Sequence, residues 1–529
     1  MNIPLTPLRF LHRAMDLYPR KTGVICGAKR FTYREFGERA ERLASALTAY
    51  GIREGDRVAF LSFNSHHLLE GYFGVVQAKA IVMPLNVRLT APELIDILNH
   101  AEARILFFET DFSRTVEQLR RACPSIERFF VLNEPHPLAD ANYEDFIQTG
   151  EPGRADIMAY DENSIAELFY TSGSTGTPKG VMLSHRTLYL HAFPVITCFF
   201  LDDTAVDLHT IPLFHANGWA RPQSTTMMGA THVMIRRFDP VEVFRLVQQE
   251  RVTNMALVPT MANSLINAPE RSQYDLSSLR VIHIGGAASS PELVKRVEES
   301  MGCRCLAGYG LTETAPVLTS SRPKSTVQPR DEEDRHLRQS MAGWPIPGCE
   351  VRVVDLEMQD VARDMEAIGE VVARGDNIMS GYFKEPEATR AVMTGEWFHT
   401  GDMAVWDEEG FVQIVDRKKD IIISGGENIS SIEVEKAIFA HPAVFECAVV
   451  SAPEPKWGEI PVAIVVLKEG QKLSSEELLE FLAARLARFK LPRQIEFSHE
   501  PLPKTGTGKI VKRALREAYW GDRSRRVQG

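Results

Sequence analysis

Apolar residues recur at helical spacing early in the chain. Between Phe36 and Leu47 they stand three or four positions apart, which places them on one face of a helix. Thr32 and Glu35 precede this face with the spacing of a capping box, in which each side chain bonds a free backbone N–H group. Gly51 follows the last apolar position. The pattern therefore predicts a helix that begins after Thr32.

Short apolar runs follow this helix and indicate buried strands. Val58–Phe63, Ile81–Leu85 and Ile105–Phe108 have the length of strands, and the stretch 65–80 reads as a helix between the first two. Strands that alternate with helices form a mostly parallel sheet covered by helices. The alternation continues to about residue 400. One charged stretch within it, Asp331–Arg338, is expected to be a surface loop.

The pattern changes near residues 416–420, where nearly every side chain is charged. A smaller α+β pattern follows. Its expected elements are a helix near Glu433–Ala440, strands at Ala448–Ser451 and Val462–Leu467, and a helix that opens at Ser474 with Glu477 in capping-box spacing. The predicted fold is therefore α/β. A large N-terminal domain, residues 1–416, has mostly parallel sheets covered by helices, and a small α+β C-terminal domain spans residues 417–529.

Composition narrows the class of protein. With 529 residues the chain is too long for one hydrophobic core, and 44% hydrophobic and 25% charged residues are ordinary for a globular protein in water. The net charge of −10 argues against a nucleic-acid partner, because nucleic-acid affinity depends on a basic surface. A local positive site for a small anionic substrate remains compatible with this charge.

The sequence carries no signal for export or membrane insertion. Met1–Arg20 lacks a signal-peptide pattern, and no run of about eighteen apolar residues predicts an integral membrane segment. The last residues, Arg526–Gly529, differ from a peroxisomal tripeptide. The seven cysteines are scattered, and Cys303–Cys305 is a poor zinc signature, so buried thiols in a reducing compartment are expected. These observations predict a cytoplasmic protein.

The most informative segment is Tyr170–Val181, a loop rich in Ser, Thr and Gly between two short apolar runs. It offers backbone N–H groups, hydroxyl donors, three glycines that permit close approach, and one cation, Lys179. That combination suits an oligophosphate. It is not a Walker loop, because the stretch Gly176–Gly180 lacks an adjacent Gly-Lys pair.

This segment resembles the signature of the acyl-adenylate-forming ligases, the superfamily of acyl-CoA synthetases, luciferases and peptide-synthetase adenylation domains. Further matching segments follow in the family's order, and the resemblance extends from about Tyr33 to Ile510. They are Pro212–Trp219, Gly285–Ala288, Tyr309–Thr314, Thr400–Asp402, Asp416–Asp420, Ser424–Glu427 and Pro503–Ile510.

The resemblance implies a nucleotide site. The residues expected to bind ATP are Thr171, Ser172, Gly173, Ser174, Thr175, Gly176, Lys179, Gly286, Ala287, Tyr309, Gly310, Asp402 and Arg417. Glu313 is the implied Mg²⁺ partner, since Mg²⁺ prefers oxygen ligands, and Thr312 is the implied phosphate contact. Asp402 suits the two ribose hydroxyls because a carboxylate accepts two hydrogen bonds. Lys509 is the implied catalytic cation between the attacking carboxylate and the α-phosphate.

Other matches concern the acid and the thiol. His215 is expected near the substrate carboxylate, and Gly285 and Gly286 leave space beside it. Trp219 aligns with a residue that gates the acyl tunnel in long-chain members, but a structural core tryptophan is an open alternative. Gly425, Gly426 and Glu427 are implied near the pantetheine of coenzyme A, and the small domain is implied to turn about a hinge near Lys419. Asn428 departs from the aromatic residue that several long-chain members carry there.

The resemblance implies an AMP-forming acyl-CoA synthetase that uses ATP, Mg²⁺ and coenzyme A. The pocket sequence favours a small-molecule carboxylic acid of the medium-chain, long-chain or aryl type, and leaves the choice among them open. The alternative is a stand-alone adenylation enzyme that loads an acyl group onto a carrier protein. A luciferase-like oxygenase shares the motifs, but nothing in the sequence identifies a luminogenic substrate. The missing Walker geometry argues against a phosphotransferase that makes an acyl phosphate, and the joint presence of Glu313, Asp402, Arg417 and Lys509 argues against a non-catalytic scaffold. A homodimer is implied only by the long-chain branch of the family.

Overall fold

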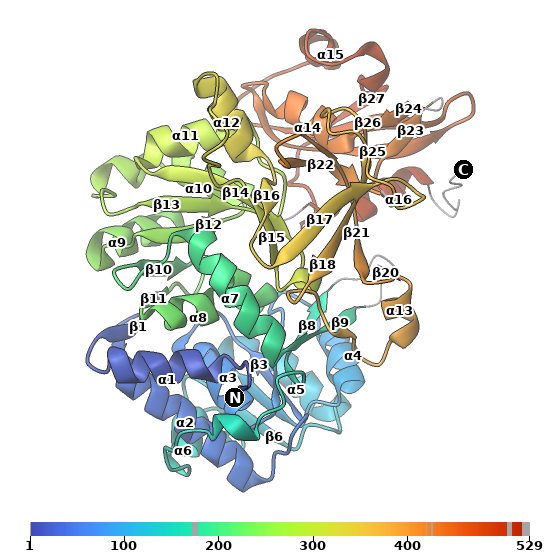
Figure 1. The fold of residues 1–529 in the computed structure, drawn as a ribbon. Helices are drawn as coiled ribbons and strands as arrows, with labels where there is room; N and C mark the ends of the chain where they lie inside the picture. The colour runs from blue at the N-terminus through green and yellow to red at the C-terminus, as the bar shows by residue number, and fades with distance from the viewer. Residues whose placement is uncertain (1, 172–177, 419, 425–426, 505–509, 521–529) are drawn as a thin grey trace. The chain divides into compact units, whose positions relative to one another are not determined.

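A computed structural model describes residues 2–171, 178–418, 420–424, 427–504 and 510–520 (Figure 1). The chain divides into two compact units. The first consists of Met1–Val351 with Ala373–Phe398, and the second of Arg352–Val372 with His399–Gly529. The predicted boundary near residues 416–420 lies inside the second unit. The division into compact units does not test whether the small domain rotates. The hinge near Lys419, which lies outside the described residues, therefore stays a prediction.

The first unit contains two large sheets. In one sheet the strand order is β19 (Gly381–Tyr382), β9 (Lys179–Ser184), β8 (Ile165–Thr171), β4 (Ile81–Pro84), β3 (Arg57–Leu61), β5 (Ile105–Phe108), β6 (Arg128–Val131) and β7 (Ala141–Asn142). Its pairs from β8 to β7 are parallel, and β8–β9 and β9–β19 are antiparallel.

In the other sheet the order is β16 (Trp344–Pro345), β15 (Val317–Ser320), β14 (Arg304–Gly310), β13 (Val281–Ile284), β12 (Asn254–Leu257), β10 (Val206–His209), β11 (Thr231–Met234), β1 (Thr22–Cys26) and β2 (Lys29–Thr32). The strands from β14 to β1 are parallel neighbours. The sequence prediction of mostly parallel sheets is confirmed.

Helices connect these strands. They are α1 (Leu8–Leu17), α2 (Tyr33–Tyr50), α3 (His66–Gln77), α4 (Ala91–Ala101), α5 (Ser113–Ala122), α6 (Tyr143–Gln148), α7 (His185–Phe199), α8 (Ala216–Met228), α9 (Pro240–Glu250), α10 (Pro259–Asn267), α11 (Pro291–Met301), α12 (Glu332–Ser340) and α13 (Pro386–Arg390). Short 3₁₀ turns occupy Thr110–Phe112, Ile157–Ala159, Pro269–Gln273 and Thr312–Thr314. The predicted capping box of Thr32 and Glu35 is present at the start of α2.

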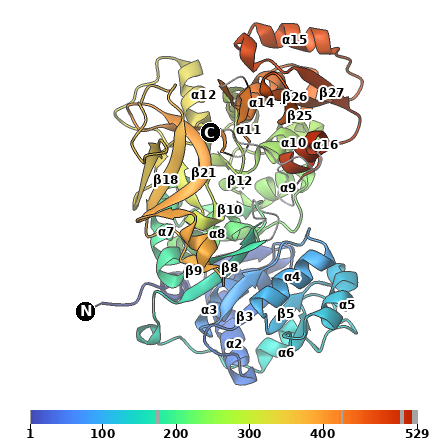
Figure 2. The same ribbon diagram turned by 90° about the vertical axis from the view of Figure 1, so that its right-hand side faces the viewer.

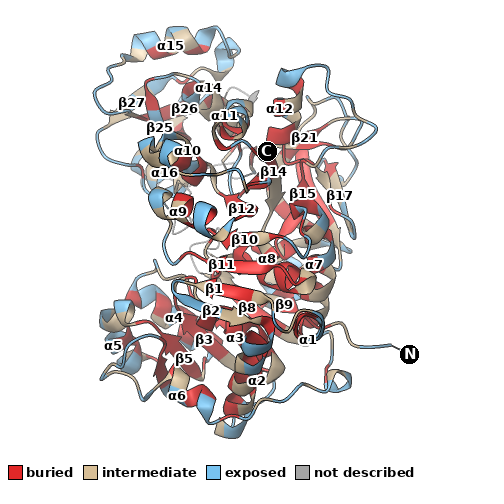
Figure 3. Cartoon of the chain, turned by 90° about the vertical axis from the view of Figure 1, so that its left-hand side faces the viewer, coloured by how far each residue is buried: buried red, intermediate tan, exposed pale blue. Residues whose placement is uncertain are grey.

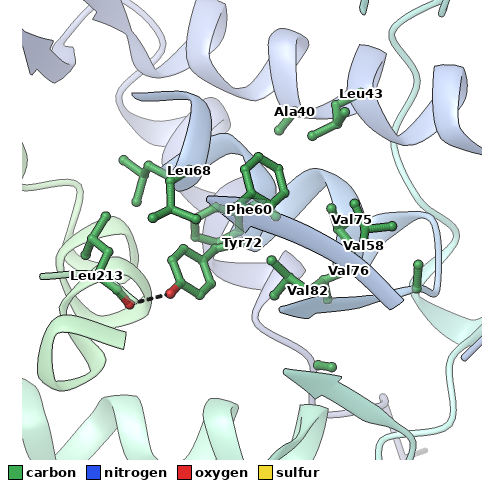
Figure 4. Packing of buried hydrophobic residues seen from close by; sticks show 14 of the residues in the cluster. Ala40, Leu43, Val58, Phe60, Leu68, Tyr72, Val75, Val76, Val82 and Leu213 are labelled. Atoms are coloured by element: carbon green, nitrogen blue, oxygen red, sulfur yellow. Dashed lines mark hydrogen bonds between the residues drawn. The ribbon is translucent and has the colours of Figure 1, made fainter. Parts of the chain in front are cut away.

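Alternating residues of β3 face opposite sides of its sheet. Val58 and Phe60 pack with residues of α2 and α3 (Figure 4), whereas Ala59 and Leu61 pack with α4 and α5. Figure 2 shows these two helix pairs on the two sides of the sheet. A parallel sheet covered on both faces buries nearly all of its strand residues, and β3, β4 and β5 are buried in this way (Figure 3).

The division between the units falls within three strands, β17 (Cys349–Val354), β18 (Gly369–Gly375) and β21 (Trp397–Trp406). The short strand β20 (Met393–Thr394) pairs with β21. The second unit has a sheet in the order β24 (Glu427–Ile429), β23 (Ile422–Ser424), β26 (Gly458–Leu467) and β25 (Val444–Glu454), with β27 (Gln494–Ser498) beside β26. Its other elements are β22 (Val412–Arg417), α14 (Ser431–Phe439), α15 (Ser475–Ala483), a 3₁₀ turn at Arg488–Lys490, and α16 (Lys512–Trp520). The predicted α+β pattern and the Ser474–Glu477 capping box are confirmed.

One predicted loop is wrong. The charged stretch Asp331–Arg338 forms most of α12. Asp331 caps this helix, because its side chain accepts a hydrogen bond from the Asp334 N–H group at 2.8 Å. Arg335 Nη1 also donates to Glu298 Oε2 at 2.7 Å, which ties the helix to α11. Capping and this tertiary contact hold a helix whose composition suggested a loop.

No helix among the described residues is long and apolar enough to cross a bilayer.

Candidate active site

The predicted phosphate loop joins two paired strands. Thr171 ends β8 and Lys179 begins β9, and the two residues stand directly opposite each other in the antiparallel pair. Strand pairing therefore brings together the two residues that flank the predicted segment. Ser172, Gly173, Ser174, Thr175 and Gly176, which the sequence assigns to ATP binding, lie outside the described residues.

A second predicted segment leaves β14 and enters the 3₁₀ turn Thr312–Thr314. Gly310 is required at the end of β14, because a Cβ atom there would lie 1.7 Å from the carbonyl oxygen of Pro316. Thr312 is buried and Glu313 is partly exposed. The turn is fixed by Thr314, whose hydroxyl donates to the carbonyl oxygen of Pro316 at 2.6 Å. The backbone thus presents Thr312 and Glu313 at the end of a parallel strand.

Glu313 contacts a residue that sequence reasoning missed. The hydroxyl of Tyr382, on β19, donates to Glu313 Oε1 at 3.0 Å. The ammonium group of Lys179 lies 4.9 Å from the centre of the Tyr382 ring, a cation–π distance. Burial, and then the neighbouring Glu313 carboxylate, raise the pKa of Tyr382, so its hydroxyl keeps its proton. Tyr382 thereby links the predicted phosphate lysine to the predicted metal carboxylate.

The chemistry of Glu313 fits the magnesium that the resemblance implies. Its carboxylate offers oxygen, the ligand type that Mg²⁺ prefers, and it is partly open to solvent. Its bond to a protonated tyrosine keeps the carboxylate in one orientation. Glu313 would hold the ion, and Lys179 would add a second positive charge nearby.

Several predicted residues line one pocket of the first unit. The carboxyl ends of β10, β12, β13 and β14 meet at one edge of their sheet, because these strands are parallel neighbours, and such edges hold ligand sites in α/β proteins. The pocket has a volume of about 580 Å³ with its opening included. The predicted residues that line it are His215, Trp219, Gly285, Gly286, Tyr309, Gly310 and Thr312. Ala287 is exposed and Glu313 is adjacent in sequence to this lining.

Trp219 packs closely on the glycine pair. A Cβ atom at Gly285 would lie 2.9 Å from Trp219 Cη2 and 3.1 Å from the carbonyl oxygen of Gly308. Gly286 has a φ of +75°, a conformation that side chains rarely adopt. Trp219 also packs against the hydrophobic cluster of this sheet, so it belongs to both the pocket and the core. Gly285 is therefore required by the tryptophan ring that faces it.

The segment that precedes His215 is held by two side chains from the other sheet's layer. Asn64 Nδ2 donates to the carbonyl oxygens of His209 at 2.7 Å and Ile211 at 3.0 Å, and its Oδ1 accepts from the Leu213 N–H group at 2.7 Å. The hydroxyl of Tyr72 donates to the Leu213 carbonyl oxygen at 2.6 Å (Figure 4). These bonds fix the path of the backbone that carries His215 into the pocket.

The predicted ribose residues lie together in the second unit. Asp402 on β21 stands opposite Arg417 on β22, and Arg417 Nε lies 2.9 Å from Asp402 Oδ1. Asp402 is buried and Arg417 is partly exposed. Strand register thus brings two residues fifteen positions apart into one ion pair.

A buried polar cluster adjoins this pair in the same unit. Asp416 Oδ2 accepts hydrogen bonds from the Ser431 N–H group at 2.7 Å and hydroxyl at 2.5 Å. Lys512 Nζ donates to the Ser431 hydroxyl at 2.5 Å and lies 2.8 Å from Glu435 Oε1. Burial raises the pKa of both Asp416 and Glu435. Lys512, at the start of α16, therefore lies close to two carboxylates, Asp416 on β22 and Glu435 on α14, and offsets their charge.

Other predicted residues cannot be placed. Lys509, Gly425 and Gly426 lie outside the described residues, and Glu427 begins β24. Their roles stay predictions.

One further cluster in the described chain has metal-ligating residue types. Ligand atoms of His66, His67 and Glu144 lie within 4.8 Å of one another. Arg39, however, donates to both oxygens of Glu144 at 2.8 Å. The Arg39 guanidinium already neutralises the Glu144 carboxylate, so we interpret the cluster as structural and not as a metal site.

Comparisons with known proteins agree with this geometry. The sequence matches the family described as AMP-binding enzyme over residues 11–383 and the family described as AMP-binding enzyme C-terminal domain over residues 433–509.

Similar proteins match along almost their whole length. A long-chain-fatty-acid–CoA ligase of Thermus thermophilus is 41% identical over 96% of this chain and 95% of its own. A peroxisomal butyrate–CoA ligase of Arabidopsis thaliana is 36% identical over 98% of this chain and 93% of its own. The crystal structure of the anthranilate CoA ligase AuaEII with anthranoyl-AMP has a TM-score of 0.88 and 28% identity, covering 98% of both chains.

Proposed function

This chain belongs to the AMP-binding enzyme family, within the acyl-adenylate-forming ligases, and from that premise we propose that it joins a fatty or aryl carboxylic acid to coenzyme A in two steps. It is an acid–thiol ligase of the AMP-forming class. The proposal concerns the acid, the sequence of steps and the residues that carry them.

The observation that carries the proposal is the composition of the pocket. Segments after β10, β13 and β14, predicted independently from the sequence, line the same cavity. Its lining is mostly apolar, with a few polar side chains among it: His215, His283, Tyr309, Thr312, Thr319 and Ser320. An apolar cavity with a few converging polar groups suits an acid with an apolar body. No Lys, Arg, Asp or Glu lines this pocket in the described chain, which disfavours an amino acid as substrate.

The first step activates the acid. A carboxylate is a poor electrophile, because attack on it would have to expel oxide. Its oxygen attacks the α-phosphorus of ATP, the bond from that phosphorus to the bridging oxygen of pyrophosphate breaks, and pyrophosphate leaves. Thr312 contacts the phosphate, and Lys509 supplies positive charge between the carboxylate and the α-phosphate. Bound magnesium, held by Glu313, would neutralise phosphate charge.

The second step transfers the acyl group. The thiol of coenzyme A attacks the acyl carbonyl carbon, the bond from that carbon to the AMP oxygen breaks, and AMP leaves as the thiol loses its proton. Asp402 and Arg417 hold the ribose, and His215 lies near the reacting carboxyl group. We place the pantetheine beside Gly425–Glu427, and the second step after rotation of the small domain about Lys419.

The test is an assay of pyrophosphate and AMP with octanoate, hexadecanoate and benzoate, each with and without coenzyme A. AMP together with thioester supports the proposal. Pyrophosphate exchange without thioester would favour loading of a carrier protein, and ADP would overturn the proposal.

A further inference from the structure

Phe199 and His283 line the pocket but have no place in the chemistry proposed above. Phe199 is the last residue of α7, and His283 lies on β13. Their ring centroids are 4.1 Å apart, with an angle of 32° between the planes. Each residue is 3% exposed. The two rings therefore form one packed piece of the pocket wall.

A buried guanidinium also contacts the phenyl ring. The Cζ atom of Arg221, on α8, lies 4.2 Å from the centre of the Phe199 ring. Arg221 Nε donates to Asp207 Oδ2 at 2.8 Å, and its Nη2 donates to the other oxygen of the same carboxylate. The Thr225 hydroxyl also donates to Asp207 Oδ2 at 2.8 Å. A paired charge thus lies against the phenyl ring.

The backbone around Phe199 is fixed by hydrogen bonds. Asn254 Nδ2 donates to the Phe199 carbonyl oxygen at 2.6 Å. His283 Nε2 lies 2.8 Å from the carbonyl oxygen of Cys198, which only accepts, so Nε2 carries the proton. Burial, and then the charge of Arg221, lower the pKa of His283 to about 3. The imidazole therefore stays neutral at physiological pH, and protonation does not loosen this wall.

We propose that Phe199, in contact with His283 and Arg221, limits the length of the acyl chain, so that the enzyme prefers medium-chain and single-ring aromatic acids to long-chain acids. The inference rests on the proposed function. A longer chain would have to displace the phenyl ring. That displacement breaks the ring stack and the cation–π contact, and it places alkyl carbons against the desolvated Arg221–Asp207 pair. A shorter acid leaves the wall intact.

The test compares kcat/KM for AMP formation with octanoate and hexadecanoate, in the presence of coenzyme A and below the critical micelle concentration of each acid. The wild-type kcat/KM for octanoate should exceed that for hexadecanoate by at least about tenfold. This is the lower end of the discrimination that one additional methylene produces in a hydrophobic pocket. Phe199→Ala should raise the hexadecanoate-to-octanoate ratio by about tenfold or more. Phe200→Ala is the matched control, because the neighbouring phenylalanine is 41% exposed and outside the pocket lining. Its ratio should equal that of the wild type.

Arg221→Lys provides a second variant. It keeps a positive charge near Asp207 but removes the planar group that stacks on Phe199. The ratio should move in the direction of Phe199→Ala, with folding checked by thermal melting. Equal use of the two acids by the wild type, or an unchanged ratio in Phe199→Ala, would overturn the inference while AMP formation still supports the ligase. Absence of AMP with octanoate, hexadecanoate and benzoate would overturn the proposed function and the inference with it.

Discussion

The hydroxyl of Tyr382 donates a hydrogen bond to Glu313 across 69 positions of sequence. The bond exists because β19 pairs with β9, the strand that begins at Lys179, the lysine predicted to bind phosphate. A strand of two residues thereby orients the carboxylate to which we assign magnesium. Lys179 contacts the ring of Tyr382, and the hydroxyl of Tyr382 holds the carboxylate, so both contacts come from the same strand pair.

Replacing Tyr382 by Phe should weaken adenylation and its response to magnesium. Loss of one hydrogen bond to a charged carboxylate costs about 1.5–3 kcal/mol, or roughly 10- to 150-fold in kcat/KM for ATP. The measurement is pyrophosphate release over a magnesium titration. Tyr189→Phe, in the same unit but stacked on Phe10 outside the pocket lining, is the control. An unchanged magnesium response in Tyr382→Phe would contradict the orienting role.

Lys509→Ala should separate the two half-reactions. Adenylation should fall by about 10²–10³, the effect of removing one preorganised donor, while supplied acyl-adenylate still yields thioester. The two half-reactions are measured by pyrophosphate release and by thioester formation. Lys472→Ala, an exposed lysine of the same unit, should leave both unchanged. Equal loss of both in Lys509→Ala would refute the role given to this lysine.

Gly285→Ala should disturb the acid site through Trp219. The added Cβ atom would lie 2.9 Å from Trp219 Cη2, so the indole has to move. Overpacking of this kind costs about 1–3 kcal/mol. We therefore expect kcat/KM for octanoate to fall by about tenfold. Trp219→Phe combined with Gly285→Ala should recover part of this loss, because phenylalanine lacks the crowded atom. If the double variant loses the product of both single effects, the two residues do not interact.

The stability of the first unit should fall below pH 6.5. Burial lowers the pKa of His191 to about 4 and of His209 to about 3, from 6.5. At a pH between the pKa of the folded chain and 6.5, the histidine is protonated in the unfolded chain but not in the folded chain. Each histidine therefore lowers the free energy of unfolding by about 1.4 kcal/mol for each unit that the pH falls within this range. Urea unfolding at pH 7, 6 and 5 measures this slope. Constant stability from pH 7 to 5 would show that these histidines become exposed or protonated before unfolding.

Lys512→Met should destabilise the second unit. The change leaves the Glu435 carboxylate buried beside Asp416 without its cation, at a cost of about 3–5 kcal/mol. Hydrogen exchange of the α14 and α16 amides, followed by mass spectrometry, measures the local effect. Lys512→Arg retains the charge and should exchange nearly as slowly as the wild type. Fast exchange in both variants would mean that lysine packing, and not charge, holds the cluster.

Local features were predictable from sequence where local chemistry determines them. The capping boxes of Thr32 and Ser474 appear where their spacing predicts, because cap and helix are adjacent in the chain. The stretch Asp331–Arg338 was predicted wrongly, since its helix depends on a contact with Glu298 that sequence does not show. Motif resemblance found His215, Gly285 and Thr312, and the structure gathers them in one pocket.

Tertiary relationships account for the residues that were missed. Tyr382 acts through strand pairing, and Asn64 acts on a backbone segment 145 positions or more away. No local pattern marks Tyr382. Phe199 likewise looks like an ordinary apolar residue at a helix end until His283 and Arg221 are seen beside it. An asparagine directly after a predicted strand was the one available signal for Asn64.

Phe199 ends a helix, whereas Gly286 follows a strand of the sheet and Tyr309 belongs to one. The residue that we assign to chain length and the residues that we assign to nucleotide chemistry therefore occupy different elements. A substitution at the helix end can change which acids the enzyme accepts, while the residues that carry out the reaction stay unchanged. Such a division lets one scaffold diversify by single steps, each of which leaves a working ligase.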